Sequence, residues 1–168
     1  MDFGTLVGSY PGHMKSVIEL HQTVMRDMDS PYTVAERELI AAYTSAINAC
    51  SFCYGSHRTV AEALGVDSEL LSAMLDDLET APISGKLKSV FRLVKKLTES
   101  PSKVTHADRS EVLAAGWGEQ GIVDACLICG MFNMMNRLVD GTGIKAHESQ
   151  FAALADEQAA INMYRIGL

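Results

Sequence analysis

Apolar side chains recur at three- and four-residue intervals along almost the whole chain, and this period constrains the fold more than any other feature. The interval matches the turn of an α-helix, whose apolar stripe packs against neighbouring helices. Signals for β-strands are nearly missing, because no long alternation of β-branched residues occurs and no Asn-Gly or Asp-Gly turn joins two such runs. The sequence therefore predicts an all-α fold of about seven to eight helices.

Capping and breaking residues place the expected helices along the chain. Thr33-Val-Ala-Glu36 is a capping box, and the helix that follows it is expected to run to about Asn48. The next helix carries two cysteines and is expected to end at Gly65, a residue type that readily adopts the left-handed conformation after a helix. The remaining expected helices cover about residues 14–29, 68–78, 86–100, 105–115, 119–139 and 146–161.

Length and composition indicate a single domain over residues 1–168. The formal net charge of −7 argues against nucleic acid as a partner, because phosphate binding needs a basic surface. The chain begins without a basic and apolar secretory signal, and it has no unbroken apolar run long enough to span a membrane. We therefore expect a cytoplasmic protein without a membrane partner, in a compartment that keeps thiols reduced.

The segment Cys50-Ser-Phe-Cys53-Tyr-Gly-Ser-His57 carries the strongest chemical signal. On a helix, Cys53 and His57 lie one turn apart on the same face, so the imidazole can reach the thiol. Cys50 is expected at or near the helix N-terminus, where the positive end of the helix dipole favours a thiolate. A thiol must ionise before it attacks a peroxide or a disulfide. The segment therefore indicates a redox-active dithiol with its own base.

Two other interpretations of this segment are possible. Cys50 and Cys53 could simply be small buried apolar residues. Together with His57 they could also supply part of a structural zinc site, which needs four ligands. No fourth ligand lies close enough in sequence to be counted on, so we expect no bound metal and no other cofactor.

Cys126 and Cys129 repeat the same spacing in a different setting. They lie within an almost unbroken apolar run, and no His, Lys or Arg is found within one turn of them. Burial in apolar surroundings raises the pKa of a thiol and makes it less reactive. We expect this second pair to pack in the core.

Several other polar residues stand out less. Asn133 and Asn136 lie in the same apolar stretch, and buried amides must find hydrogen bonds, so we expect them to be structural. His21 and His106 have no evident partner in the sequence, and we expect them at the surface or in caps.

The capped helix and the cysteine helix together resemble the carboxymuconolactone decarboxylase superfamily, and specifically its AhpD-like alkylhydroperoxidase branch. The motif of that branch is a Glu twelve residues before Cys-x-x-Cys-x-x-x-His, and Glu38 stands twelve residues before Cys50. The segments Ala114-Ala-Gly-Trp-Gly118, Phe132-Asn-Met-Met-Asn-Arg137 and Gly141-Thr-Gly143 resemble the uncharacterised peroxidase-related subgroup of the branch. The similarity spans about residues 30 to 145.

This resemblance implies a compact helical domain that assembles as a homotrimer or homohexamer. It implies a dithiol that reduces a hydroperoxide or a partner's disulfide and is restored by a protein or a small-thiol reductant. Cys53 would attack, Cys50 would resolve, and Glu38 and His57 would relay protons. The helix dipole favours Cys50 instead, by on the order of 0.3 to 1 kcal/mol. A positioned base contributes about 10²-fold or more, so we expect Cys53 to attack.

One position departs from the branch, and two other functions remain as alternatives. AhpD proper can carry a second His between the cysteines, whereas this chain has Phe52 there, which shortens the relay. A decarboxylase-type lyase would act through Glu38 and His57. A thiol redox sensor would use the dithiol without turnover. The decarboxylase side of the superfamily lacks the dithiol, which favours the redox function.

Overall fold

A computed structural model describes residues 1–27 and 29–163 of the chain. The described residues form ten α-helices and no β-strand, so the all-α prediction is confirmed. Eight of these helices are seven residues or longer, in line with the expected number.

The elements follow one another with short connections. Their bounds are α1 (Phe3–Ser9), α2 (Pro11–Gln22), the π-helical turn η1 (Thr23–Asp27), α3 (Val34–Ile47), α4 (Ser51–Ala63), α5 (Leu70–Asp76), α6 (Gly85–Glu99), the 3₁₀ turn η2 (Pro101–Lys103), α7 (His106–Ala114), α8 (Gly118–Gly141), α9 (Glu148–Ala152) and α10 (Glu157–Asn162).

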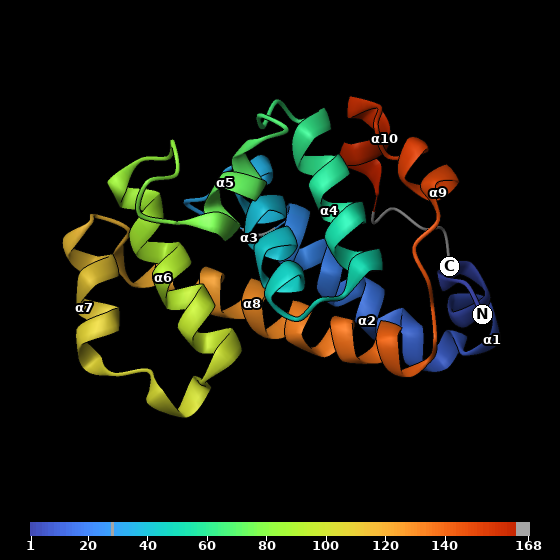
Figure 1. The fold of residues 1–168 in the computed structure, drawn as a ribbon. Coiled ribbons are helices and arrows are strands. Elements are labelled where there is room, and N and C mark those ends of the chain that lie inside the picture. Colours follow the sequence, from blue (N-terminus) through green and yellow to red (C-terminus); the bar gives the residue numbers. More distant parts are fainter. Residues whose placement is uncertain (28, 164–168) are drawn as a thin grey trace.

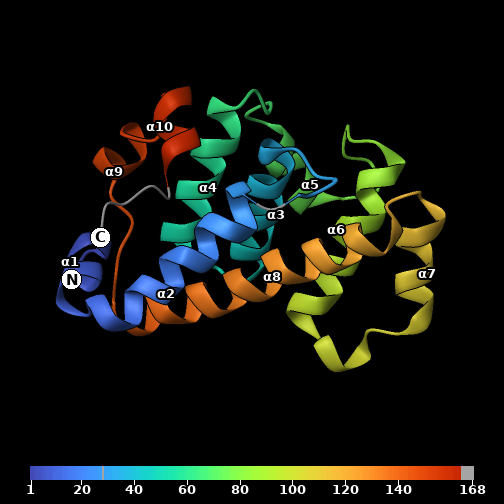
Figure 2. The ribbon, with the colours of Figure 1, turned by 180° about the vertical axis from the view of Figure 1, so that it is seen from behind.

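The long helix α8 runs along the fold, with α2 beside it (Figures 1 and 2). Helix α3 packs most extensively against α4 and α8. Helices α6 and α7 lie at one end of α8, and α1, α9 and α10 lie at the other end (Figure 1). By length and composition α8 could cross a membrane, but more than half of its apolar stretch is buried inside the fold. It is therefore placed as the central helix of the core.

The junction between α3 and α4 fixes the position of the dithiol. The backbone N–H of Ala49 donates to the carbonyl of Ala46 (2.9 Å), and that of Cys50 donates to the carbonyl of Ser45 (3.0 Å). This is the Schellman pattern, in which the residue after the C-cap adopts a left-handed conformation. Ala49 does so with a φ of 56°. The chain thereby turns within three residues and leaves Cys50 as the N-cap of α4.

The expected start of α3 is confirmed. The Thr33 hydroxyl accepts the N–H of Glu36 (3.2 Å), and the Glu36 carboxylate accepts the N–H of Thr33 (2.8 Å). These two bonds satisfy backbone donors that the first helical turn leaves without partners.

Two expected helices differ from the structure at the ends of the chain. The first was expected over about 14–29, but α2 begins at Pro11, and a π-helical turn replaces its last part. Proline fits the first position of a helix because its missing N–H would be unpaired there anyway. The single helix expected over about 146–161 was wrong. The Asp156 side chain accepts the N–H of Ala159 (3.0 Å) and starts a separate helix, α10.

Candidate active site

Two neighbouring helices supply the residues that the sequence analysis selected. Helix α3 carries Glu38, and α4 carries Cys53 and His57, with Cys50 at its N-cap. All four residues are buried, with at most 4% of their surface exposed. The fold therefore gathers these four residues in its interior, away from bulk water.

Glu38 lies between two nitrogen donors. Its Oε2 is 2.6 Å from His57 Nδ1, and its Oε1 is 2.6 Å from Nη2 of Arg26 in an ion pair. Burial alone would raise the pKa of Glu38, but His57 and Arg26 outweigh burial and lower it. A carboxylate only accepts hydrogen bonds, so Nδ1 of His57 carries a proton. Nε2 is then the basic nitrogen of the neutral ring.

The two thiols titrate as a pair. A hydrogen bond from Cys53 lowers the pKa of Cys50, although burial opposes this effect. The same hydrogen bond raises the pKa of Cys53, and burial raises it further. The N-cap position acts in the same direction, because the helix dipole stabilises a thiolate at Cys50. The first negative charge of the pair therefore rests on Cys50, with Cys53 as its donor.

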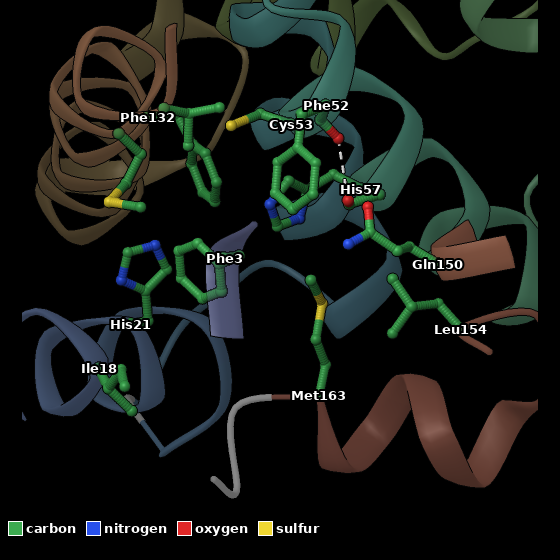
Figure 3. Close-up of a pocket in the computed structure, with 13 residues that line it drawn as sticks. Phe3, Ile18, His21, Phe52, Cys53, His57, Phe132, Gln150, Leu154 and Met163 are labelled. Carbon is green, nitrogen blue, oxygen red and sulfur yellow. Dashed lines mark hydrogen bonds between the residues drawn. The ribbon is translucent and has the colours of Figure 1, made fainter. Parts of the chain in front are cut away.

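Cys53 and His57 line a common cavity of about 250 Å³. Most of its wall is apolar and includes Phe3, Phe52 and Phe132. Figure 3 shows Cys53 and His57 beside Phe52, with His21 and Phe3 below Phe132 and with Gln150, Leu154 and Met163 along another side. Moving from water into such a space is favourable for an apolar molecule, which would then lie next to a thiol and an imidazole.

The C-terminal helices cover this cavity. We call residues 148–163 the C-terminal cover, since Leu154 and Met163 belong to the cavity wall. The ring of Phe151 lies directly on Gly55 of α4, and a Cβ at that glycine would come within 2.3 Å of the ring. Glycine is thus the residue that permits this close approach of the cover to the cysteine helix.

The sequence analysis missed two residues of the site. Arg26 lies on η1, and its position depends on a π-helical turn that no sequence signal announced. His21 was expected at the surface, which was wrong, because it is buried and lines the cavity. Its Nδ1 donates to the carbonyl of Val17 (2.8 Å), and its ring meets the edge of Phe132. His106 is exposed, as expected.

The protonation of His21 leads to a prediction about acid stability. Burial lowers the pKa of His21 from 6.5 to about 4. Between these values the unfolded chain binds a proton that the folded protein does not bind, so the free energy of unfolding falls as the pH falls. This contribution is complete above about pH 6.5, is lost by about pH 4 and amounts to roughly 3 kcal/mol.

Urea unfolding between pH 7 and pH 4 measures this loss. His21→Gln should lose less stability than the wild type over this range, because glutamine does not titrate. His106→Gln, at the exposed histidine, should behave like the wild type. An equal loss in the wild type and His21→Gln would contradict the prediction.

The second cysteine pair lies in the core, as predicted. Cys129 is fully buried and Cys126 packs against the core cluster. Burial raises the pKa of both thiols. The sulfur of Cys129 also lies 3.3 Å from the hydroxyl of Thr98 and 3.4 Å from the amide of Asn133. The Cys129 sulfur therefore has two polar neighbours, although most of the surrounding helix is apolar.

The two asparagines of α8 join α8 to the end of α3. The amide of Asn48 donates to the side-chain oxygens of Asn133 (3.1 Å) and Asn136 (2.8 Å). Asn136 in turn donates to the hydroxyl of Ser45 (3.0 Å). Both amides therefore have the hydrogen bonds that they were expected to need. A hydrogen bond from Asn136 also lowers the pKa of Cys53, although this effect is weaker than the opposing ones.

A zinc site would need four ligands that converge on one point. In residues 1–27 and 29–163, no group of three or more His, Cys, Asp or Glu side chains is placed to hold a metal ion. The nitrogen Nδ1 of His57 faces Glu38 instead. The arrangement suits proton and thiol chemistry.

Comparison with known proteins gives matches over most of the chain. The sequence model of the carboxymuconolactone decarboxylase family matches residues 11–96. The uncharacterized protein YdfG of Bacillus subtilis (strain 168) is 27% identical in an alignment of 128 residues that covers 73% of this chain and 87% of that protein.

Two solved structures share the fold. A peroxidase-related protein from Silicibacter sp. TM1040 superposes with a TM-score of 0.76 at 23% identity, over 84% of this chain and 73% of that one. An alkylhydroperoxidase AhpD core protein from Ralstonia eutropha JMP134, also described as peroxidase-related, has a TM-score of 0.79 at 19% identity, over 97% and 80%. At these identities the likeness establishes the fold alone.

Proposed function

The chain belongs to the carboxymuconolactone decarboxylase family, and we propose that within this family it acts as a dithiol peroxidase or disulfide reductase. The observation that carries the proposal is that Cys53, whose thiol is hydrogen-bonded to that of Cys50, lines the same apolar cavity as His57. A hydroperoxide with an apolar substituent suits this cavity, because its carbon chain leaves water on binding. Its O–O bond can then lie beside the thiol.

The proposed reaction starts with the loss of one proton from the dithiol to Nε2 of His57. The remaining proton moves from Cys53 to Cys50, and the Cys53 thiolate attacks the terminal oxygen of the hydroperoxide. The O–O bond breaks, and an S–O bond forms in a sulfenic acid at Cys53. The alkoxide leaves with the proton that His57 received, which yields an alcohol.

A disulfide completes the oxidative half of the cycle. The sulfur of Cys50 attacks that of Cys53, and hydroxide leaves as water with the proton of Cys50. Residues three apart on a helical turn lie within the reach of a disulfide. Overall, two thiols and one hydroperoxide give one disulfide, one alcohol and one water.

A protein or small-thiol reductant then restores the two thiols by disulfide exchange. Cys50 borders a shallow hollow of about 270 Å³ together with Ala46, Tyr54 and Leu75. This hollow shares no described lining residue with the cavity of Cys53. We propose that the reductant approaches from the hollow, so that peroxide and reductant use different routes. A cytoplasmic location would supply such reductants.

Oxidation by one equivalent of an alkyl hydroperoxide tests the proposal. We expect a reversible Cys50–Cys53 disulfide, while Cys126 and Cys129 remain thiols because burial raises their pKa. Peptide mapping identifies the oxidised pair, and alcohol formation with dithiothreitol as electron donor measures turnover. Oxidation of the second pair first would contradict the proposal. Disulfide formation without catalysed alcohol formation would favour the redox sensor. The absence of both reactions would favour the lyase.

We propose, in addition, a homotrimer or homohexamer that uses one face of α8. Val123, Leu127 and Met134 lie on this face and are between 43% and 50% exposed. Their spacing of four and seven residues makes a continuous apolar stripe on the helix surface. Association would remove the stripe from water. Light scattering at micromolar concentration should give a multiple of the chain mass, and a monomer would contradict this assembly.

A further inference from the structure

Arg26 reaches the proposed proton relay from outside the cysteine motif. The π-helical turn η1 carries it, and such turns inside helical segments are frequent at functional sites. Its side chain is almost fully buried, and its Nη2 lies 2.6 Å from Oε1 of Glu38. Glu38 therefore presents one oxygen to Arg26 and the other to His57.

The same guanidinium also holds the C-terminal cover. Its Nη2 donates to the carbonyl of Ala160 (2.9 Å), and its Nε donates to the carbonyl of Ile161 (3.2 Å). Both carbonyls belong to α10, at the far end of the chain from η1. Arg26 thus touches the relay and the cover at once, and movement of the cover would remove two of its acceptors.

The charges around Glu38 explain what Arg26 does for the relay. Arg26 faces Glu38 from η1, His21 lies nearby on α2, and Cys53 and His57 face the site from α4. His21 is neutral near pH 7, because burial lowers its pKa to about 4.

Two further charged residues lie close to the site, Arg37 on α3 and Asp140 on α8. Arg37, one residue before Glu38 on α3, is buried and directs its Nη1 toward the carbonyl of Val24. Helix α8 presents Phe132 and Met135 to the cavity, and its Asp140 acts to raise the pKa of both thiols. Helix α10 presents carbonyl groups to Arg26. Arg26 is therefore the cation paired directly with the buried carboxylate.

A buried carboxylate without a cation attracts a proton strongly. An opposite charge at this distance typically moves a carboxyl pKa down by about one to three units. With Arg26 in place, Glu38 stays ionised, and the Glu38–His57 pair does not take up a proton from solvent. His57 therefore remains able to accept a proton from the dithiol. Without Arg26, the pair would keep a proton up to a higher pH than with it.

We propose that Arg26 is a positioning residue that keeps the Glu38–His57 pair ready to accept a proton and couples this state to the C-terminal cover. Closure of the cover holds the guanidinium against Glu38, and opening releases it. The relay is therefore set for catalysis when the cavity is closed over its substrate. The catalytic meaning rests on the proposed function, whereas the charge coupling itself does not.

Arg26→Gln and Arg26→Lys test this coupling, with Arg58→Gln as the matched control. Arg58 pairs with Glu62 on the surface of α4 and does not reach the cavity. NMR follows the ring nitrogens of His57 against pH in the full-length protein. In Arg26→Gln, the midpoint of their change should move up by about one pH unit or more. Arg26→Lys should restore most of the wild-type midpoint, and Arg58→Gln should leave it unchanged.

Amide hydrogen exchange reports on the cover in the same variants. Exchange in α10 should be faster in Arg26→Gln than in Arg58→Gln, since two carbonyl contacts are lost. An unchanged midpoint or unchanged exchange in folded Arg26→Gln would overturn the proposal. If Arg26→Gln does not fold, Arg26→Lys provides the test, because one ammonium group keeps the charge but cannot replace contacts made from two separate guanidinium nitrogens. Faster exchange in α10 than in Arg58→Gln then supports the coupling, and equal exchange overturns it.

Turnover separates this inference from the proposed function. If the wild type lacks peroxidase activity, the NMR midpoint and the exchange rates still decide whether Arg26 couples relay and cover. If the wild type is active, the acid limb of its pH–rate profile should move to higher pH in Arg26→Gln, and an unmoved acid limb would count against the coupling.

Discussion

Cys53→Ser is expected to reduce peroxide-dependent turnover to the uncatalysed background. A serine hydroxyl does not ionise near neutral pH and cannot form a disulfide, so both halves of the oxidation are lost. Cys50→Ser should behave differently, because its Cys53 can still react once with a hydroperoxide. The product is a sulfenic acid at Cys53, which dimedone traps and mass spectrometry locates. Cys126→Ser, a substitution in the second pair, should retain turnover.

This experiment also decides between two opposing effects in the site. The hydrogen bond from Cys53 lowers the pKa of Cys50, which makes Cys50 the first thiolate. The cavity and His57, in contrast, lie beside Cys53. A proton shared between the sulfurs reconciles the two, since the charge can move to the sulfur that meets the substrate. A sulfenic acid at Cys50 in Cys53→Ser, with an unreactive Cys50→Ser, would assign the attack to Cys50.

His57→Asn should lower turnover by about 10²-fold or more, the usual effect of losing a positioned base. Asparagine can keep a donor near the position of Nδ1 and so preserve the hydrogen bond to Glu38, but it cannot accept and return a proton. The loss should shrink as the pH rises toward the ordinary thiol pKa of about 8.5, because solvent then ionises the dithiol.

Turnover and alkylation rates across this pH range provide the measurement. His106→Asn changes an exposed histidine and should match the wild type. Wild-type rates in His57→Asn at every pH would mean that the helix N-terminus activates the thiols without the imidazole. Glu38→Gln should show a smaller loss with the same pH trend, because Glu38 acts through His57.

Local sequence signals were sufficient to predict the elements that carry the dithiol. The capping box at Thr33, the glycine at Gly65 and the spacing of Cys53 and His57 each depend on a few neighbouring residues. The interactions that these signals predict form between residues within one or two helical turns of each other. The confirmed helices α3 and α4 follow from these signals. The apolar run around Cys126 and Cys129 similarly predicted that this pair packs against the core.

Contacts between distant parts of the chain could not be predicted in this way. Arg26 bonds to a carbonyl 134 residues away, and its direction depends on a π-helical turn. His21 is buried because the cavity walls meet around it, and its place between Val17 and Val24 in an apolar stripe was the one local sign of this. The split between α9 and α10 similarly depends on one capping side chain, Asp156, within an otherwise helical pattern. Such features follow from tertiary packing rather than from local propensity.

The use of both chain ends to wall the cavity has a consequence for biosynthesis. Phe3 and Met163 line the same space, and Arg26 donates to two carbonyls of α10. Helices α3 and α4 are neighbours in sequence, so their mutual contacts can form early, while the chain is still being synthesised. The cysteine helix is then in place on the ribosome before its cover exists. Oxidants in the cell would therefore meet the thiols of the nascent chain more easily than those of the finished protein.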